Sequence, residues 1–137
     1  MNETNLEIKD QLERAPVSFQ YTRAQALADG VLVDLSDWAK ETGFKIPVAC
    51  TAAVWNGYLV PTERTRTLGQ SERGRAHDLL WTLVNAIRRA KHGGRLLFKT
   101  MFLQTPERRI LVEFKAVCGP GDRAEPTVTV MLPGEDS

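Results

Sequence analysis

Apolar side chains recur every three or four positions between Ser71 and His92, which is the spacing of one face of an α-helix. Gly93 and Gly94 follow at once and are suited to ending a helix. Each fully buried Leu or Ile stabilises a fold by about 1.5–3 kcal/mol. We therefore expect a helix over residues 72–92 whose apolar face packs on the rest of the protein. The recurring apolar positions are Ala76, Leu79, Leu80, Leu83, Val84, Ile87 and Ala90.

The apolar spacing after this helix changes to alternation and predicts three strands. Residues 95–104 and 109–118 are rich in apolar side chains and flank a four-residue turn that contains proline. In the second segment Glu113 and Lys115 alternate with apolar neighbours, as in a strand with one side in water. Residues 127–130 alternate again after a Gly-Pro-Gly-Asp turn. We expect these three strands to form an antiparallel sheet beneath the long helix.

The N-terminal half predicts shorter elements. Thr22 and Gln25 have the spacing of a capping box, so a helix should begin there and end at the next glycine. Residues 31–35 indicate a short buried strand that could add a fourth member to the sheet. Ser36 is suited to cap a second helix, which should end at Gly43.

Two further segments complete the predicted organisation. Residues 48–58 follow Pro47, which is favoured in the first turn of a helix, so a third helix is expected there. β-Branched side chains at three positions of this segment leave a strand as the alternative. Residues 61–74 mix Pro, Gly, Ser and Thr and predict an internal loop.

The 137 residues of the chain suit one domain. Residues 21–134 are predicted to form an α+β domain, in which a three- to four-stranded, mainly antiparallel sheet packs against one long helix and several short helices. Residues 1–20 hold few apolar side chains and predict a loosely ordered leader, and residues 135–137 predict an acidic tail. No apolar segment approaches the roughly 20 residues of a membrane span, and the N-terminus lacks the apolar core of a secretory signal. We expect a cytoplasmic protein with no membrane partner; nothing in the sequence indicates its oligomeric state.

The two cysteines do not make a disulfide framework. Cys50 and Cys118 both lie among apolar neighbours in the sequence. We interpret them as small, reduced core residues, as expected in a cytosolic protein.

The formal net charge is only +1, but it is distributed unevenly along the chain. Residues 61–118 hold twelve Lys or Arg against five Asp or Glu, which is a formal charge of +7. Residues 1–60 and residues 119–137 carry −3 each. Such a concentration of one sign bears on partners and on electrostatic steering rather than on the fold.

Nine cations of the positive segment form the predicted binding surface. Arginines at loops and helix ends can contact phosphates through two parallel hydrogen bonds, so nucleic acid or another anionic partner is expected. The alternative is a solvated helix face whose charge is offset by the acidic ends of the chain. Arginine anchors are also common in protein interfaces, which makes a host protein the second candidate partner. The nine residues are Arg64, Arg66, Arg73, Arg75, Arg88, Arg89, Lys91, Arg95 and Lys99.

Exposed tryptophans can serve as stacking platforms for bases, and the chain has three tryptophans. Trp38 and Trp55 stand among apolar residues of the predicted helices, which favours packing in the core. Trp81 is offset from the centre of the apolar face of the long helix, so it could be exposed at the edge of a groove.

Catalytic and metal-binding chemistry has little support in the sequence. His77 and His92 would lie about 22 Å apart along one helix and cannot share a metal ion. No paired Cys or His spacing typical of metal sites occurs. The carboxylates Asp29, Asp34 and Glu125 could serve a small enzyme, but nothing in the sequence organises them into a site. We predict no catalytic residue, no metal, no cofactor and no enzymatic activity.

Three segments resemble a known family. The strings YTRAQALADGVLVDLS (21–36), IPVACTAAVW (46–55) and GPGDRAEPTVTVMLPGED (119–136) are similar, in the same order, to small uncharacterised bacterial proteins carried on plasmids, conjugative elements and phages. The resemblance implies a mobile genetic element as the setting. It implies no catalytic or binding residue.

Together these features favour a non-catalytic binding or regulatory protein of a mobile genetic element. The Arg-rich surface is expected to engage nucleic acid or another anionic partner. The first alternative is an inhibitor or modulator that binds a protein of a host system, and the second is a small enzyme.

Overall fold

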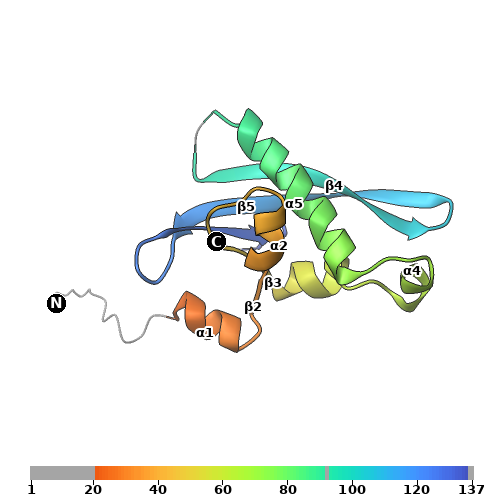
Figure 1. Cartoon of the computed structure of the whole chain (residues 1–137), viewed down its shortest axis with the longest axis horizontal. Helices are drawn as coiled ribbons and strands as arrows, with labels where there is room; N and C mark the ends of the chain where they lie inside the picture. The colour runs from red at the N-terminus through yellow and green to blue at the C-terminus, as the bar shows by residue number, and fades with distance from the viewer. Residues whose placement is uncertain (1–20, 92, 136–137) are drawn as a thin grey trace.

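The computed structural model describes residues 21–91 and 93–135, and these form a sheet with helices on both faces (Figure 1). The expected leader, residues 1–20, lies outside the described residues, as do His92 and residues 136–137. The strands are β2 (Leu32–Asp34), β3 (Val48–Thr51), β4 (Arg95–Thr105), β5 (Arg108–Pro120) and β6 (Pro126–Met131). The helices are α1 (Arg23–Ala28), α2 (Ser36–Glu41), α3 (Ala52–Val54), the π-helical segment η2 (Trp55–Leu59), α4 (Glu63–Thr67) and α5 (Glu72–Arg89).

The sheet has five strands in the order β2-β3-β6-β5-β4, which is more than the three to four predicted. The β3–β6 pair is parallel and the other three pairs are antiparallel. β2 corresponds to the fourth strand expected over residues 31–35, whereas β3 was predicted as the start of a helix. Cys50 of β3 is in register with Val130 of β6. The long connection from β3 back to β6 runs through α3, η2, α4, α5 and the β4–β5 hairpin.

The helix predicted over residues 48–58 is therefore wrong for residues 48–51, where the strand left as the alternative forms instead. Residues 48–50 are fully buried, so they show no alternation, and an apolar run of this length does not by itself distinguish a strand from a helix. Pro47 precedes a strand instead of opening a helix, and its carbonyl accepts a hydrogen bond from the Val128 N–H at 2.9 Å. The chain becomes helical only after Thr51, whose hydroxyl accepts from the Val54 N–H and caps α3.

α5 covers one face of the sheet over β4, as Figure 1 shows. Its buried side chains include the predicted apolar positions from Ala76 to Val84. On the sheet beneath, Phe98, Phe102 and Phe114 form an aromatic cluster with ring centroids 5.7–6.0 Å apart between Phe114 and the other two. Thr82 of α5 and Thr100 of β4 are joined by a hydrogen bond of 2.6 Å between their hydroxyls, so the even-numbered side chains of β4 face α5. α5 ends at Arg89, three residues before the predicted end.

α1 begins where the sequence predicted, with a capping box between Thr22 and Gln25. A second contact fixes the same helix start from a distant part of the chain. The carboxylate of Asp122, in the β5–β6 turn, accepts hydrogen bonds from the Arg23 and Ala24 N–H groups at 2.8 and 3.0 Å. α1 therefore lies at the opposite end of the molecule from the β4–β5 turn, close to the sheet strands that precede and follow Asp122 (Figure 1).

Some local predictions were wrong. Ser36 is not a helix cap, because its hydroxyl instead exchanges hydrogen bonds with the backbone of Val48 and joins α2 to β3. The internal loop over residues 61–74 contains the short helix α4, capped by Thr62. Cys50 is buried as expected, but Cys118 is exposed. Among residues 21–91 and 93–135, no helix combines the length and apolar character of a membrane span.

Candidate nucleic-acid interface

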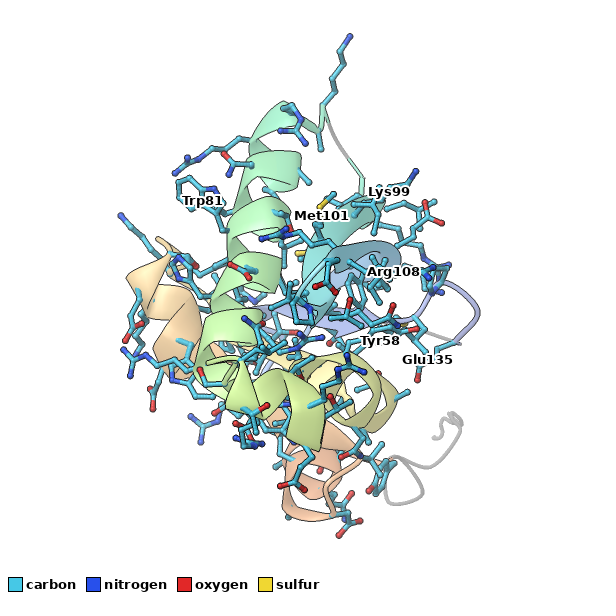
Figure 2. All side chains as sticks on the ribbon, turned by 90° about the vertical axis from the view of Figure 1, so that its right-hand side faces the viewer. Tyr58, Trp81, Lys99, Met101, Arg108 and Glu135 are labelled. Carbon is cyan, nitrogen blue, oxygen red and sulfur yellow. The ribbon has the colours of Figure 1, made fainter. Side chains whose placement is uncertain are left out.

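The nine predicted cations do not come together on one surface. Figure 2, a view from the end of the molecule that holds the β4–β5 turn and α4, shows Trp81 of α5 and Lys99 of β4 on opposite sides of the molecule. The set divides into four residues around the start of α5, three at its end, and two on β4. Each group has different partners, and the partners decide what the cations can do.

Around the start of α5, carboxylates of the same protein pair with two arginines. Arg66 donates two hydrogen bonds to the Glu72 carboxylate, at 3.0 and 3.1 Å, and this contact holds the pKa of Glu72 below its ordinary value. Arg73 forms an ion pair with Glu41 of α2. Arg64 is exposed on α4. The positive charge of this end is therefore partly offset within the molecule.

Arg75 is a structural residue, only 7% exposed. Its Nε donates to the Tyr58 carbonyl at 2.6 Å, and its Nη1 donates to the Leu103 carbonyl at 3.1 Å. The guanidinium carbon lies 4.5 Å from the centroid of the Phe102 ring, a cation–π contact. Burial lowers the pKa of Arg75 from its ordinary value. Arg75 thus ties α5 to η2 and β4, and it is not accessible to a partner.

The end of α5 has a different environment. Arg88, Arg89 and Lys91 are exposed, and none of them forms an ion pair with another described residue. Arg88 and Arg89 are in the last turn of α5, where cations interact favourably with the negative end of the helix dipole, so their placement is also locally stabilising. Because no other described residue pairs with these cations, their positive charge is available to solvent and to a partner molecule.

An exposed tryptophan lies on the same outer face of α5. Trp81 is 52% exposed, and Asn85 Nδ2 donates to the Trp81 carbonyl at 2.9 Å. Residues 81, 85 and 88 are successive neighbours on one helix face, because their spacing is four and three. The outer face of α5 therefore combines an indole, an amide and guanidinium groups; we call Trp81, Asn85, Arg88, Arg89 and Lys91 the α5 patch. The sequence left exposure of Trp81 open as a possibility, and the structure shows it exposed. Trp38 and Trp55 are half-buried and stack on each other, 6.2 Å apart.

The two β4 cations differ in their position relative to the α5 patch. Lys99 is in register with Glu113 of β5 and alternates with Thr100, which faces α5, so Lys99 points to the other face of the sheet. Arg95 borders an apolar groove that also includes Ala90 at the end of α5. Arg108 and Arg109, exposed at the β4–β5 turn, were not in the predicted set. They lie in the positive segment of residues 61–118, so the charge count over that segment was a signal that could have added them to the predicted surface.

The described residues do not assemble a catalytic site. Among them, no group of three or more His, Cys, Asp or Glu could hold a metal ion. Asp29 ends α1 and accepts a hydrogen bond from the Tyr21 hydroxyl at 2.6 Å. Asp34 and Glu125 border one small hollow, but each accepts a hydrogen bond from a neighbouring backbone N–H. Burial raises the pKa of the Cys50 thiol to about 12, so it stays protonated.

The comparisons with known proteins bear on the family alone. A family model described as a family of unknown function (DUF6573) matches residues 8–136. The chain belongs to this family. The match covers α1 through β6 and also residues 8–20 of the leader. No curated protein matches the chain, and no solved structure does. Membership in DUF6573 therefore assigns no substrate, ligand or residue role, and the functional argument rests on the side chains described above.

Proposed function

We propose that this DUF6573 protein is a non-catalytic binding protein that engages single-stranded nucleic acid through the α5 patch. The observation that carries the proposal is the exposure of Trp81 on the same helix face as Arg88. An indole ring can stack on an unpaired base, and stacking of this kind contributes about 1–3 kcal/mol per base. The adjacent guanidinium groups can contact the phosphates on either side of that base.

The composition of the patch favours a single strand over a duplex. In a duplex the bases are stacked on each other and offer only their edges in the grooves. A tryptophan on a helix surface therefore cannot stack on a base of a duplex, whereas the phosphates would still attract the arginines. We therefore expect measurable binding to both forms and tighter binding to the single strand.

The wider setting extends the proposal. We place the protein in the bacterial cytoplasm as a regulatory product of a mobile genetic element such as a plasmid or phage. The support for this setting is the resemblance of residues 21–36, 46–55 and 119–136 to proteins of such elements. A nucleic-acid-binding role without catalysis is in keeping with it.

Fluorescence anisotropy with labelled single- and double-stranded DNA oligonucleotides of one sequence tests the proposal. Binding should weaken steeply between about 50 and about 200 mM salt, because each phosphate contact releases a counterion. In Arg88→Glu/Arg89→Glu, the affinity should fall roughly tenfold or more. The slope of log affinity against log salt should become shallower by the amount expected for the loss of about two phosphate contacts.

The matched control is Arg108→Glu/Arg109→Glu. It changes the net charge by the same amount, and Figure 2 shows Arg108 on the side of the molecule away from Trp81. The control should retain most of the affinity. Equal losses in the two variants would mean that only net charge matters and would refute the α5 patch. The absence of binding by the wild-type protein at about 50 mM salt would refute nucleic-acid binding altogether.

A further inference from the structure

The apolar face of α5 is longer than the part of it that the fold buries. The buried side chains of the helix run from Arg75 to Val84. Ile87, one turn further along the same face, is 37% exposed, and Ala90 at the end of the helix is exposed as well. The end of the apolar face is therefore only partly covered by other described residues.

This end of the helix borders a groove of about 520 Å³. The groove lies between the last turns of α5, the first residues of β4 and the loop that precedes β3, and Val84, Ile87 and Ala90 line it on the helix side. Sites for small molecules are typically cavities of about 300–1,000 Å³ with mainly apolar walls. The groove is therefore large enough to hold a small ligand.

The floor of the groove is the side of the sheet that faces α5. Leu96 is one of the even-numbered side chains of β4, which share this face, and Ala116 of β5 is directly opposite Leu96 in the register. Val128 of β6, the register partner of Cys118, also lines the groove. The groove is thus a continuation of the core layer between α5 and the sheet, in which the small Ala116 side chain leaves space.

The remaining wall is the loop between α2 and β3, to which Phe44 and Ile46 belong. Phe44 is the one aromatic residue among the described lining residues, and it is only 8% exposed, so it offers little of its ring to a ligand. The other apolar side chains of the lining are aliphatic. An aliphatic chain suits such walls better than a peptide, whose backbone N–H and C=O groups would need hydrogen-bond partners.

Charge at the groove narrows the choice of ligand further. Lys45 and Arg95 both line it, both are exposed, and neither forms an ion pair with another described residue. Among the described lining residues there is no Asp or Glu. A ligand carboxylate would therefore meet two cations and no competing carboxylate of the protein, and a guanidinium group can bind a carboxylate through two parallel hydrogen bonds.

We propose that this groove binds a straight-chain aliphatic carboxylic acid of medium length. The hydrocarbon chain would lie against Ile87 and Leu96, and the carboxylate would lie beside Lys45 and Arg95. The inference does not depend on nucleic-acid binding, because the side chains of the α5 patch are not among those that line the groove.

Calorimetric titration of the full-length protein with decanoate at neutral pH, below the concentration at which the acid forms micelles, tests the proposal. One saturable site is expected. Decanol has the same chain without the charge and should bind about tenfold more weakly, because hydrogen bonds to a charged group are lost. In Lys45→Gln/Arg95→Gln this preference should largely disappear. The matched control Lys99→Gln/Arg109→Gln removes the same charge outside the groove and should keep the preference.

The thiol of Cys118 allows the site to be located. Cys118 is exposed and lines the groove, whereas Cys50 is buried, and burial raises its pKa to about 12. The uncharged reagent N-ethylmaleimide should therefore label Cys118 alone at neutral pH. Decanoate should slow this labelling in proportion to the occupied fraction of the protein, with the same midpoint as the calorimetric titration.

Two substitutions at the rim of the groove should block it. Ala90→Trp places an indole at an exposed position that lines the groove, and Ile87→Glu places a carboxylate beside the expected ligand chain. Both should abolish decanoate binding while the far-ultraviolet circular dichroism stays unchanged. Ala28→Trp, at an exposed alanine that ends α1, is the matched control and should bind decanoate as the wild type does.

Four outcomes would overturn the inference. The first is no saturable binding of decanoate by the wild-type protein. The second is unchanged binding in folded Ala90→Trp and Ile87→Glu. The third is equal affinity of the wild type for decanoate and decanol, which would mean that the cations play no part. The fourth is labelling of Cys118 that slows as the protein concentration rises without any ligand, which would assign the groove to a second copy of the chain.

Discussion

The two ends of α5 carry the same kind of side chain and use it in opposite ways. At the start of the helix, Arg75 is buried and donates to backbone carbonyls, and Arg73 pairs with Glu41. At the end, Arg88 and Arg89 face solvent. The difference shows that an arginine count describes a binding surface only after the arginines that hold the fold together have been set aside.

The largest effect is expected for Arg75. In Arg75→Met the apolar volume is largely kept, but the carbonyls of Tyr58 and Leu103 lose their donors, and the contact with the Phe102 ring is lost. Leaving buried carbonyls unpaired costs on the order of 1–3 kcal/mol each, so the free energy of unfolding should fall by about 3 kcal/mol. Urea unfolding monitored by circular dichroism measures it.

Arg73→Met is the control for that experiment. It removes an arginine two residues away whose ion pair with Glu41 is largely exposed, so the free energy of unfolding should change by no more than about 0.5 kcal/mol. Equal destabilisation by the two substitutions would remove the distinction between a structural and a surface arginine at this end of the helix.

Trp81 gives the second largest effect, and on affinity rather than stability. Trp81→Ala should lower the affinity for single-stranded DNA about tenfold, because one stacked base is lost, and leave duplex binding nearly unchanged. The free energy of unfolding should stay within about 0.5 kcal/mol, as expected for an exposed side chain.

Leu111→Ala, which truncates a comparably exposed apolar side chain on β5, is the control for Trp81→Ala and should bind as the wild type does. A loss of several kcal/mol of stability in Trp81→Ala would place the indole in the core instead. Equal loss of affinity for single strand and duplex would argue against stacking.

The sequence was sufficient for the elements whose periodicity is strong. The apolar face of α5 and the alternation in β4, β5 and β6 each repeat over enough positions to identify the element and its buried side. β3 was predicted only as the alternative to a helix, because a short central strand that is buried on both faces has no alternation to detect. The role of Asp122 at the start of α1 was also out of reach, because it joins residues 99 positions apart.

The candidate site was predicted less well than the fold, for a physical reason. Formal charge is a property of residue type, whereas availability depends on burial and on partners that come from other elements. Arg75 precedes Leu79 by one helical turn, and that spacing could have indicated that it flanks the buried face. No comparable signal in the sequence pairs Arg73 with Glu41, which comes from a different helix. The only signal in the sequence that separates Lys99 from Arg88 is the alternation of side chains along β4. This alternation places Lys99 on the face of the sheet away from α5.

The smallest effect is expected at the exposed pair near the start of α5. The hydrogen bonds from Arg66 lower the pKa of Glu72 in the folded protein below its unfolded value. The pair therefore stabilises the fold at neutral pH, and this contribution is lost as the pH falls through the folded pKa. Glu72→Gln should be slightly less stable than the wild type at pH 7, and the difference should vanish in acid.

Glu63→Gln, in the first turn of α4, controls for the helix dipole, because Glu63 has no ion pair with another described residue. Thermal unfolding across a pH series measures both variants, and a deficit in Glu72→Gln that persists unchanged into acid would mean that the carboxylate does not act through Arg66.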